Sequence, residues 1–240
     1  MVTAMPRRGE GGQGNDPLIT GQIYHLYNRG IAGQITFPDS EAYTYFIRLL
    51  AHCKNFTTSL SRHTDLVKLY GEEKYRLVEP GNPGGLATAP VRLRAYTLMP
   101  NHFHLLIEQL VDDGIVDYIG RVCNSFTKAF NERFKRRGPL WQGRFKAVLV
   151  ADDQSFLQVS RYLHLNPLHS SHLRVKKLEE YPFSSYLEVI GKKSEVLCDH
   201  SRLQELIPSP KEYKEFVLAG ISEPEGKLLE KLTIEQFFTD

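Results

Sequence analysis

Two strand-like segments stand almost end to end in this 240-residue chain. Arg92–Met99 and His102–Gln109 are rich in branched and aromatic residues, and only the turn-forming pair Pro100-Asn101 separates them. So short a connection allows only an antiparallel hairpin, because parallel neighbours need a crossover of about a dozen residues. Any fold of this chain must therefore contain the hairpin, and the flanking segments must pack on its faces.

The flanking segments complete an α+β pattern. Upstream, Gly21–Asn28 has strand composition, and a helix is expected to start with Asp39 or Ser40 as its cap. Downstream lie an amphipathic helix, Ile115–Arg136, and a strand, Arg144–Ala151. The resulting order is the split βαββαβ pattern of ferredoxin-like folds, which predicts a central antiparallel sheet.

Helical patterns follow these six elements. The capping box that begins at Ser155 predicts a helix ended by Pro167, and residues 171–240 predict a helical C-terminal extension. Residues 1–20 and 57–90 are instead rich in Gly and Pro. We interpret the first stretch as a flexible tail and the second as a loop insertion.

Composition limits the class of protein. The three cysteines form no Cys-x-x-Cys pair, which argues against a disulfide framework or a cysteine zinc site and favours a reducing cytoplasm. The longest apolar run, Ala147–Ala151, falls far short of the roughly 18 residues that a membrane helix needs. We therefore expect a cytoplasmic protein without a membrane partner.

His102 and His104 are the sharpest candidate site residues. On a strand, side chains two positions apart share a face, so both imidazoles would converge while Phe103 points away. Such a pair can hold a divalent metal, although two polar residues on a solvated sheet face would give the same pattern. Tyr162 and Asn166 lie one helical turn apart and offer a nucleophilic and a ligand oxygen, or a packed core tyrosine.

Positive charge is concentrated between residues 114 and 150. This stretch has eight basic and two acidic residues, whereas residues 171–240 have ten basic and thirteen acidic ones. Basic side chains bind phosphates, and the aromatic residues Phe134, Trp141 and Phe145 could stack on unpaired bases. A solvated helix end, favoured by the helix dipole, would give the same charge pattern. The candidate DNA contacts are Arg121, Lys128, Arg133, Lys135, Arg136, Arg137, Arg144 and Lys146.

Five motifs occur together in the chain. They are YHLYNRG at 24–30, MPNHFHLLIE at 99–108, GPLWQGRFKAVLV at 138–150, RYLHLNP at 161–167 and YPFSSY at 181–186. In combination they resemble the REP-associated tyrosine transposases, which are single-tyrosine transposases of the HUH endonuclease superfamily. The resemblance implies a transposase domain over residues 21–170.

The resemblance also implies roles for single residues. His102 and His104 match the pair that holds Mg²⁺ or Mn²⁺, Tyr162 matches the catalytic tyrosine, and Asn166 matches the polar residue that completes the metal site. Arg29 becomes a further candidate DNA contact. The implied reaction cuts and rejoins single-stranded, hairpin-associated DNA through a 5′-phosphotyrosine intermediate, in a protein that is nucleoid-associated when bound to DNA.

Several alternatives stay open at this stage. A non-catalytic nucleic-acid-binding module shares the βαββαβ order, but it gives His102, His104 and Tyr162 no role. A metal-dependent hydrolase that uses water would explain the histidines but not the tyrosine. A domesticated nuclease that no longer mobilises its own gene would have the same sequence features. The sequence also leaves open whether the protein is a monomer or a homodimer.

Overall fold

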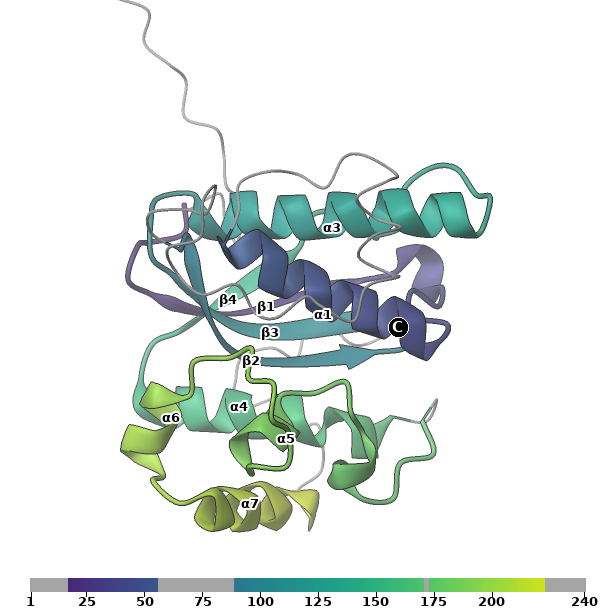
Figure 1. Ribbon diagram of the computed structural model, residues 1–240. Coiled ribbons are helices and arrows are strands. Elements are labelled where there is room, and N and C mark those ends of the chain that lie inside the picture. The colour runs from purple at the N-terminus through teal and green to yellow at the C-terminus, as the bar shows by residue number, and fades with distance from the viewer. Residues whose placement is uncertain (1–16, 56–88, 171–172, 223–240) are drawn as a thin grey trace, which may run out of the picture.

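The computed structural model describes residues 17–55, 89–170 and 173–222 (Figure 1). Its elements are β1 Ile23–Arg29, η1 Ile31–Gly33, α1 Ser40–Asn55, β2 Val91–Met99, β3 His102–Gln109, α3 Gly114–Arg133, β4 Lys146–Val150, α4 Asp153–His169, η2 Leu178–Glu180, α5 Tyr186–Val189, α6 Ser201–Leu206, α7 Pro210–Ala219 and η3 Gly220–Ser222. Within the described ranges, no helix is long and apolar enough to cross a membrane.

The four strands form one antiparallel sheet. Their order is β2-β3-β1-β4, with β1 paired to both β3 and β4. The hairpin of β2 and β3 places consecutive strands side by side, while each helical connection carries the chain across a neighbouring strand. This arrangement confirms the predicted ferredoxin-like fold with its central antiparallel sheet.

The sheet separates two helical layers (Figure 1). Helices α1 and α3 cover one face, where Phe46, Phe103 and Phe126 pack together with almost no exposed surface. Helix α4 covers the other face, with α5, α6 and α7 outside it, and Leu163 and Tyr213 belong to this second core. Burying one such apolar side chain stabilises the fold by about 1.5–3 kcal/mol, so both layers anchor the sheet between them.

Helix α4 differs from its prediction at both ends. It begins at Asp153, because the Asp152 carboxylate accepts a 2.7 Å hydrogen bond from the Ser155 amide and caps the helix three residues before the expected cap, Ser155. It also continues through Pro167 to His169. The prediction that Pro167 ends the helix is therefore wrong, and the reason is a contact with β2 that is described below.

The remaining predictions of elements fall into two groups. The helix expected at Asp39 or Ser40 is present, and the Asp39 carboxylate accepts from the Ala42 amide at 3.0 Å. Within the C-terminal extension that was expected to be helical, α6 and α7 are present. Most of the expected tail and insertion, and residues 223–240 of the expected helical extension, lie outside the described residues.

Candidate active site

A row of four side chains crosses the sheet on the face that α4 covers. In the strand registers, Tyr27 of β1 stands opposite His104 of β3 on one side and Lys146 of β4 on the other, and Thr97 of β2 stands opposite His104. Directly opposite residues in an antiparallel sheet share a face and lie close together. The row is therefore Lys146, Tyr27, His104 and Thr97, and we call it the histidine row.

Two further histidines lie in the rows on either side of the histidine row. His102 pairs in register with Arg29, at the edge where β1 ends. His25 lies in the opposite direction along β1, and its Nε2 atom is 2.9 Å from Nδ1 of His104. His25 and His104 are fully buried and their rings stack at a centroid distance of 5.1 Å. The sheet therefore presents three histidines, not two, to α4.

Tyr162 of α4 lies over these histidines. Its ring meets His104 and His25 edge-on, at centroid distances of 5.5 and 5.9 Å. The residue is 2% exposed and belongs to the core between α4 and the sheet. The tyrosine and the histidine pair that the sequence singled out are therefore brought together within one chain.

Burial keeps His25 and His104 neutral. It lowers the pKa of His25 to about 3, and it lowers the pKa of His104 well below its ordinary value, with smaller contributions from the neighbouring His102 and His25. A neutral imidazole donates from one nitrogen and accepts at the other. When Nδ1 of His104 donates to His25, its Nε2 carries the lone pair that a metal needs.

His102 is held by a similar contact. Its Nδ1 lies 2.7 Å from Oδ1 of Asn101, an acceptor that places the proton on Nδ1 and the lone pair on Nε2. The His102 and His104 rings are 4.9 Å apart and nearly perpendicular, at 87°. Nδ1 of His102 and Nδ1 of His104 therefore each have a hydrogen-bonding partner, which is the arrangement that metal-binding histidines commonly have.

Asn166 is the third residue expected at a metal. It is 6% exposed, and its Nδ2 atom makes no hydrogen bond within the described part of the chain. A rotation of the buried side-chain amide would place its oxygen where this nitrogen now lies, and that oxygen could bind a cation. The donor set of two imidazoles and one amide fits a divalent ion. Among the described residues, no three His, Cys, Asp or Glu side chains form a metal-binding group.

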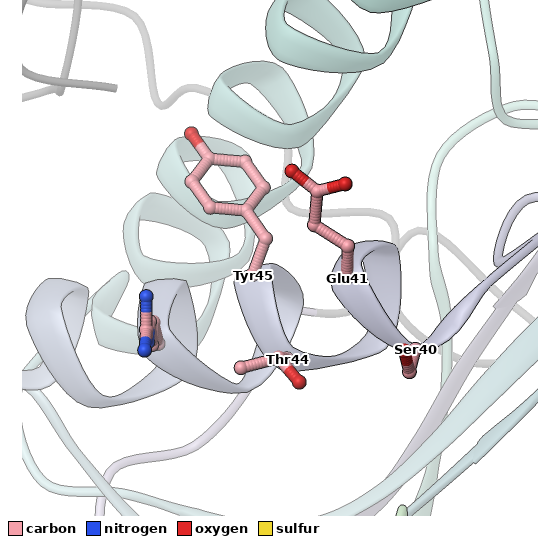
Figure 2. A pocket seen from close by; sticks show the side chains of 5 residues that line it. Ser40, Glu41, Thr44 and Tyr45 are labelled. Atoms are coloured by element: carbon pink, nitrogen blue, oxygen red, sulfur yellow. The ribbon is translucent and has the colours of Figure 1, made fainter. Parts of the chain in front are cut away.

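A shallow surface hollow of about 160 Å³ lies elsewhere (Figure 2). In Figure 2, Glu41 and Tyr45 extend from one side of α1, and Thr44 from another. This hollow is on the helix layer opposite α4 and contains no histidine, so it is separate from the histidine row. Its lining residues are Ser40, Glu41, Thr44, Tyr45 and Arg48.

The candidate DNA contacts occupy different places. Lys146 lies in the histidine row and Arg29 beside it, both at the edge where β3 begins. Arg121 lies on the opposite helix layer, where its Nη2 is 3.5 Å from the Cys53 carbonyl. Lys128 is exposed on that same helix, α3. The structure therefore does not gather all nine basic residues at one surface.

The basic residues at the end of α3 differ in their contacts. Arg133 makes a two-pronged ion pair with Asp39, at 2.9 and 2.7 Å, and contacts Glu41 at 2.9 Å, so its charge is compensated by α1. Arg136 donates to Asn131 and to the Pro139 carbonyl, which shapes the turn after the helix. The side chains of Lys135, Arg137 and Arg144 are exposed.

The three aromatic residues of the basic segment differ in how exposed they are. Trp141 is 8% exposed and packs into the core beside Phe103, and Phe145 packs against the same core. Trp141 is therefore not available for stacking on bases, contrary to expectation, because the segment folds back onto the end of β1. Phe134 is 42% exposed, with the Arg133 guanidinium 4.9 Å from its ring.

His25 and Tyr27 were not selected from the sequence. Both lie in the YHLYNRG motif with the same two-residue spacing as His102 and His104, so the signal was present in the chain. The sequence alone does not show that β1 pairs with β3, or in which register. Only that pairing brings the two spaced pairs onto one face.

Comparison with known proteins supports these motifs. Residues 86–166 match the model of a family described as "Transposase IS200 like", a stretch that runs from just before β2 to Asn166 and includes the histidine pair and Tyr162. Over residues 86–166 the chain is therefore similar to the IS200-like transposases. The match confirms the resemblance that was drawn from the motifs.

Two individual proteins are also similar to this chain. A Haemophilus influenzae protein named as a REP-associated tyrosine transposase is 26% identical over 109 residues. The match covers 40% of this chain and spans only 60% of that relative's length. A solved structure of a REP-associated tyrosine transposase bound to a REP hairpin has a TM-score of 0.45 and 16% identity, covering 84% of this chain and 96% of that one.

The buried histidines predict an acid-sensitive fold. The unfolded chain protonates His25 near its ordinary pKa of 6.5, whereas the folded chain does so only near 3, so the unfolded state binds more protons between these values. The free energy of unfolding should therefore fall as pH drops below about 6.5, by about 1.4 kcal/mol per pH unit for each such histidine. When the free energy of unfolding is measured by urea titration between about pH 4 and 5.5, its slope against pH should be smaller by nearly one proton in the His25→Gln variant. An unchanged slope would show that His25 is not held neutral in the fold.

Proposed function

We propose that this protein is a DNA transposase or single-strand endonuclease that cuts and rejoins hairpin-associated DNA through Tyr162. The observation that carries the proposal is the contact of the Tyr162 ring with His104 and His25 in a segment that matches IS200-like transposases. The name of the Haemophilus influenzae relative, a REP-associated tyrosine transposase, agrees with this class of enzyme.

In the proposed reaction, the Tyr162 hydroxyl oxygen attacks the scissile phosphorus. A bond forms between this oxygen and phosphorus, the bond to the 3′ oxygen of the preceding nucleotide breaks, and that oxygen leaves as a 3′-hydroxyl after gaining a proton. The DNA is then linked to the protein as a 5′-phosphotyrosine. A second 3′-hydroxyl can reverse the step, so strands are rejoined without ATP.

The chain's own residues would prepare this attack. His102, His104 and Asn166 would hold Mg²⁺ or Mn²⁺, which when bound supplies positive charge to polarise the phosphate. His25 fixes the His104 ring through the 2.9 Å contact, and Asn101 fixes His102 at 2.7 Å. The burial of Tyr27, His104 and Thr97 would strengthen electrostatic interactions with a phosphate that enters the site.

The DNA would approach from the edge where β3 begins. Arg29 and Lys146 lie beside the histidines at this edge, and the segment after α3 runs along it to β4. The Ile31 amide donates to the Leu140 carbonyl, and the Gln142 amide to the Arg29 carbonyl, so this segment is fixed to the end of β1. Phosphates would bind its exposed basic side chains, and Phe134 is the aromatic residue exposed for a base.

A water-using hydrolase is the second candidate, because the three histidines would also serve that chemistry. It gives no reason for a tyrosine to lie directly on them, and it predicts cleavage without a covalent intermediate. A monomer is sufficient for the proposed reaction, since Tyr162 and the histidines belong to the same chain.

The nucleophile is tested by Tyr162→Phe. With a single-stranded oligonucleotide that carries a hairpin, the wild-type protein should form an adduct that survives denaturation and maps to Tyr162 by peptide mass. The variant lacks the attacking oxygen but keeps the ring, so it should bind the hairpin and form no adduct. Cleavage without any adduct would favour the hydrolase, and an adduct on another tyrosine would reassign the nucleophile.

Metal dependence is tested by His102→Ala. Loss of one imidazole should reduce cleavage in Mg²⁺ or Mn²⁺ by at least about a hundredfold and leave hairpin binding largely intact, since other residues contact the phosphates. Calorimetric titration of Mn²⁺ gives a readout that does not depend on cleavage, and the variant should bind the ion more weakly. Wild-type cleavage and Mn²⁺ affinity in the variant would exclude this metal site.

The DNA path is tested by salt dependence. The Arg144→Gln, Lys146→Gln double variant should reduce the slope of log affinity against log salt by about 0.7–0.9 for each lost phosphate contact. Arg133→Gln is the matched control, because its charge is already compensated by Asp39 and Glu41. Equal slopes for wild type and the double variant would place the DNA on another surface.

A further inference from the structure

Helix α4 contains a proline one position after Asn166. In an α-helix, the carbonyl of Leu163 accepts from the amide four residues later, which is position 167. Pro167 has no N–H and its ring crowds that carbonyl, so the helix should end or kink here. Leu163 itself is fully buried, and an unsatisfied carbonyl in such a place is costly.

A side chain of the sheet replaces the missing donor. Oγ1 of Thr97, in β2, lies 2.8 Å from the Leu163 carbonyl oxygen. It also lies 2.9 Å from the Tyr96 carbonyl, but that oxygen already accepts from the Ser185 amide at 3.0 Å. The single hydroxyl proton of Thr97 is therefore best placed on Leu163.

The YPFSSY motif orients this hydroxyl. Ser184 Oγ is 3.1 Å from Thr97 Oγ1 and accepts from the Tyr186 amide at 3.2 Å, so its own proton can go to Thr97. The same stretch pairs with the edge of β2, where the Leu98 amide donates to the Phe183 carbonyl at 3.0 Å. A chain of hydrogen bonds therefore runs from the Tyr186 amide through the Ser184 and Thr97 hydroxyls to the Leu163 carbonyl of α4.

The next residue of α4 is fixed in a comparable way. His164 is buried, with Nδ1 2.7 Å from the Tyr213 hydroxyl of α7 and Nε2 2.8 Å from Ser185 Oγ. The turn of α4 that follows Tyr162 is therefore held by contacts with β2, with the YPFSSY motif and with α7.

We propose that Thr97 is a positioning residue for the reaction, because its hydroxyl substitutes for the absent N–H of Pro167 and fixes the turn from Tyr162 to Asn166 over the histidine row. Thr97 stands opposite His104 in the β2–β3 register, so the same residue borders the histidines and holds the helix above them. This inference rests on the proposed role of Tyr162.

The test is a double-mutant cycle. Thr97→Val keeps the shape but removes the donor, and it should slow adduct formation at saturating hairpin by about tenfold or more while the hairpin Kd stays within about twofold. Thr97→Ser keeps the hydroxyl and should retain the wild-type rate. In a Pro167→Ala background, which supplies an N–H to Leu163, Thr97→Val should cost much less.

Tyr118→Phe is the matched control for stability. It removes a buried hydroxyl that donates at 2.8 Å to a helix carbonyl, Leu50, in the layer on the other side of the sheet. It should lower the melting temperature like Thr97→Val and leave the adduct rate unchanged. A wild-type rate in Thr97→Val, an equal loss in the Pro167→Ala background, or an equal loss in Tyr118→Phe would each overturn the proposal.

Amide hydrogen exchange separates this proposal from the proposed function. Thr97→Val should lower the protection of the last turn of α4, and adding Pro167→Ala should restore it, whether or not the protein cleaves DNA. If the wild-type protein forms no adduct but exchange follows this pattern, the role of Tyr162 fails and the contact with Thr97 stands. Unchanged exchange in Thr97→Val refutes the contact itself.

Discussion

The pairing of β1 with β3 is the constraint on which the rest of the site depends. A shift of one residue in this register would turn His102 and His104 toward α1 and α3 and bring Phe103 under Tyr162. The actual register is held by both helical layers, because Phe103 packs with Phe46 on one side while His104 bonds His25 on the other. Core packing and site geometry are therefore consequences of the same hydrogen-bond ladder.

Much of this arrangement could be predicted from the sequence, because it follows from local periodicity. The two-residue spacing of His102 and His104, and the four-residue spacing of Tyr162 and Asn166, identify shared faces without knowledge of the fold. What could not be predicted depends on partners distant in sequence. Pro167 looked like a helix end because its replacement donor lies 70 positions earlier, on Thr97.

The roles of the charged residues were also beyond prediction from the sequence, because they depend on distant partners. Composition located a basic segment, but it could not distinguish Arg133, whose charge is compensated by Asp39 and Glu41 across the layer, from Lys146, which reaches the histidine row. Likewise, Trp141 and Phe134 are equivalent as aromatic residues in a basic stretch. Only the folding of that stretch onto the end of β1 buries one and exposes the other.

The paired edge of β2 has a further consequence for how this sheet meets other chains. Residues 183–185 occupy the outer edge of β2, so β4 is the outer strand without such a cover among the described elements. Strand addition by a neighbouring molecule is a common route to aggregation of sheet proteins. In the described sheet a neighbouring molecule could add a strand only beside β4. That strand has five residues and begins with the exposed Lys146, so it is a short and charged template.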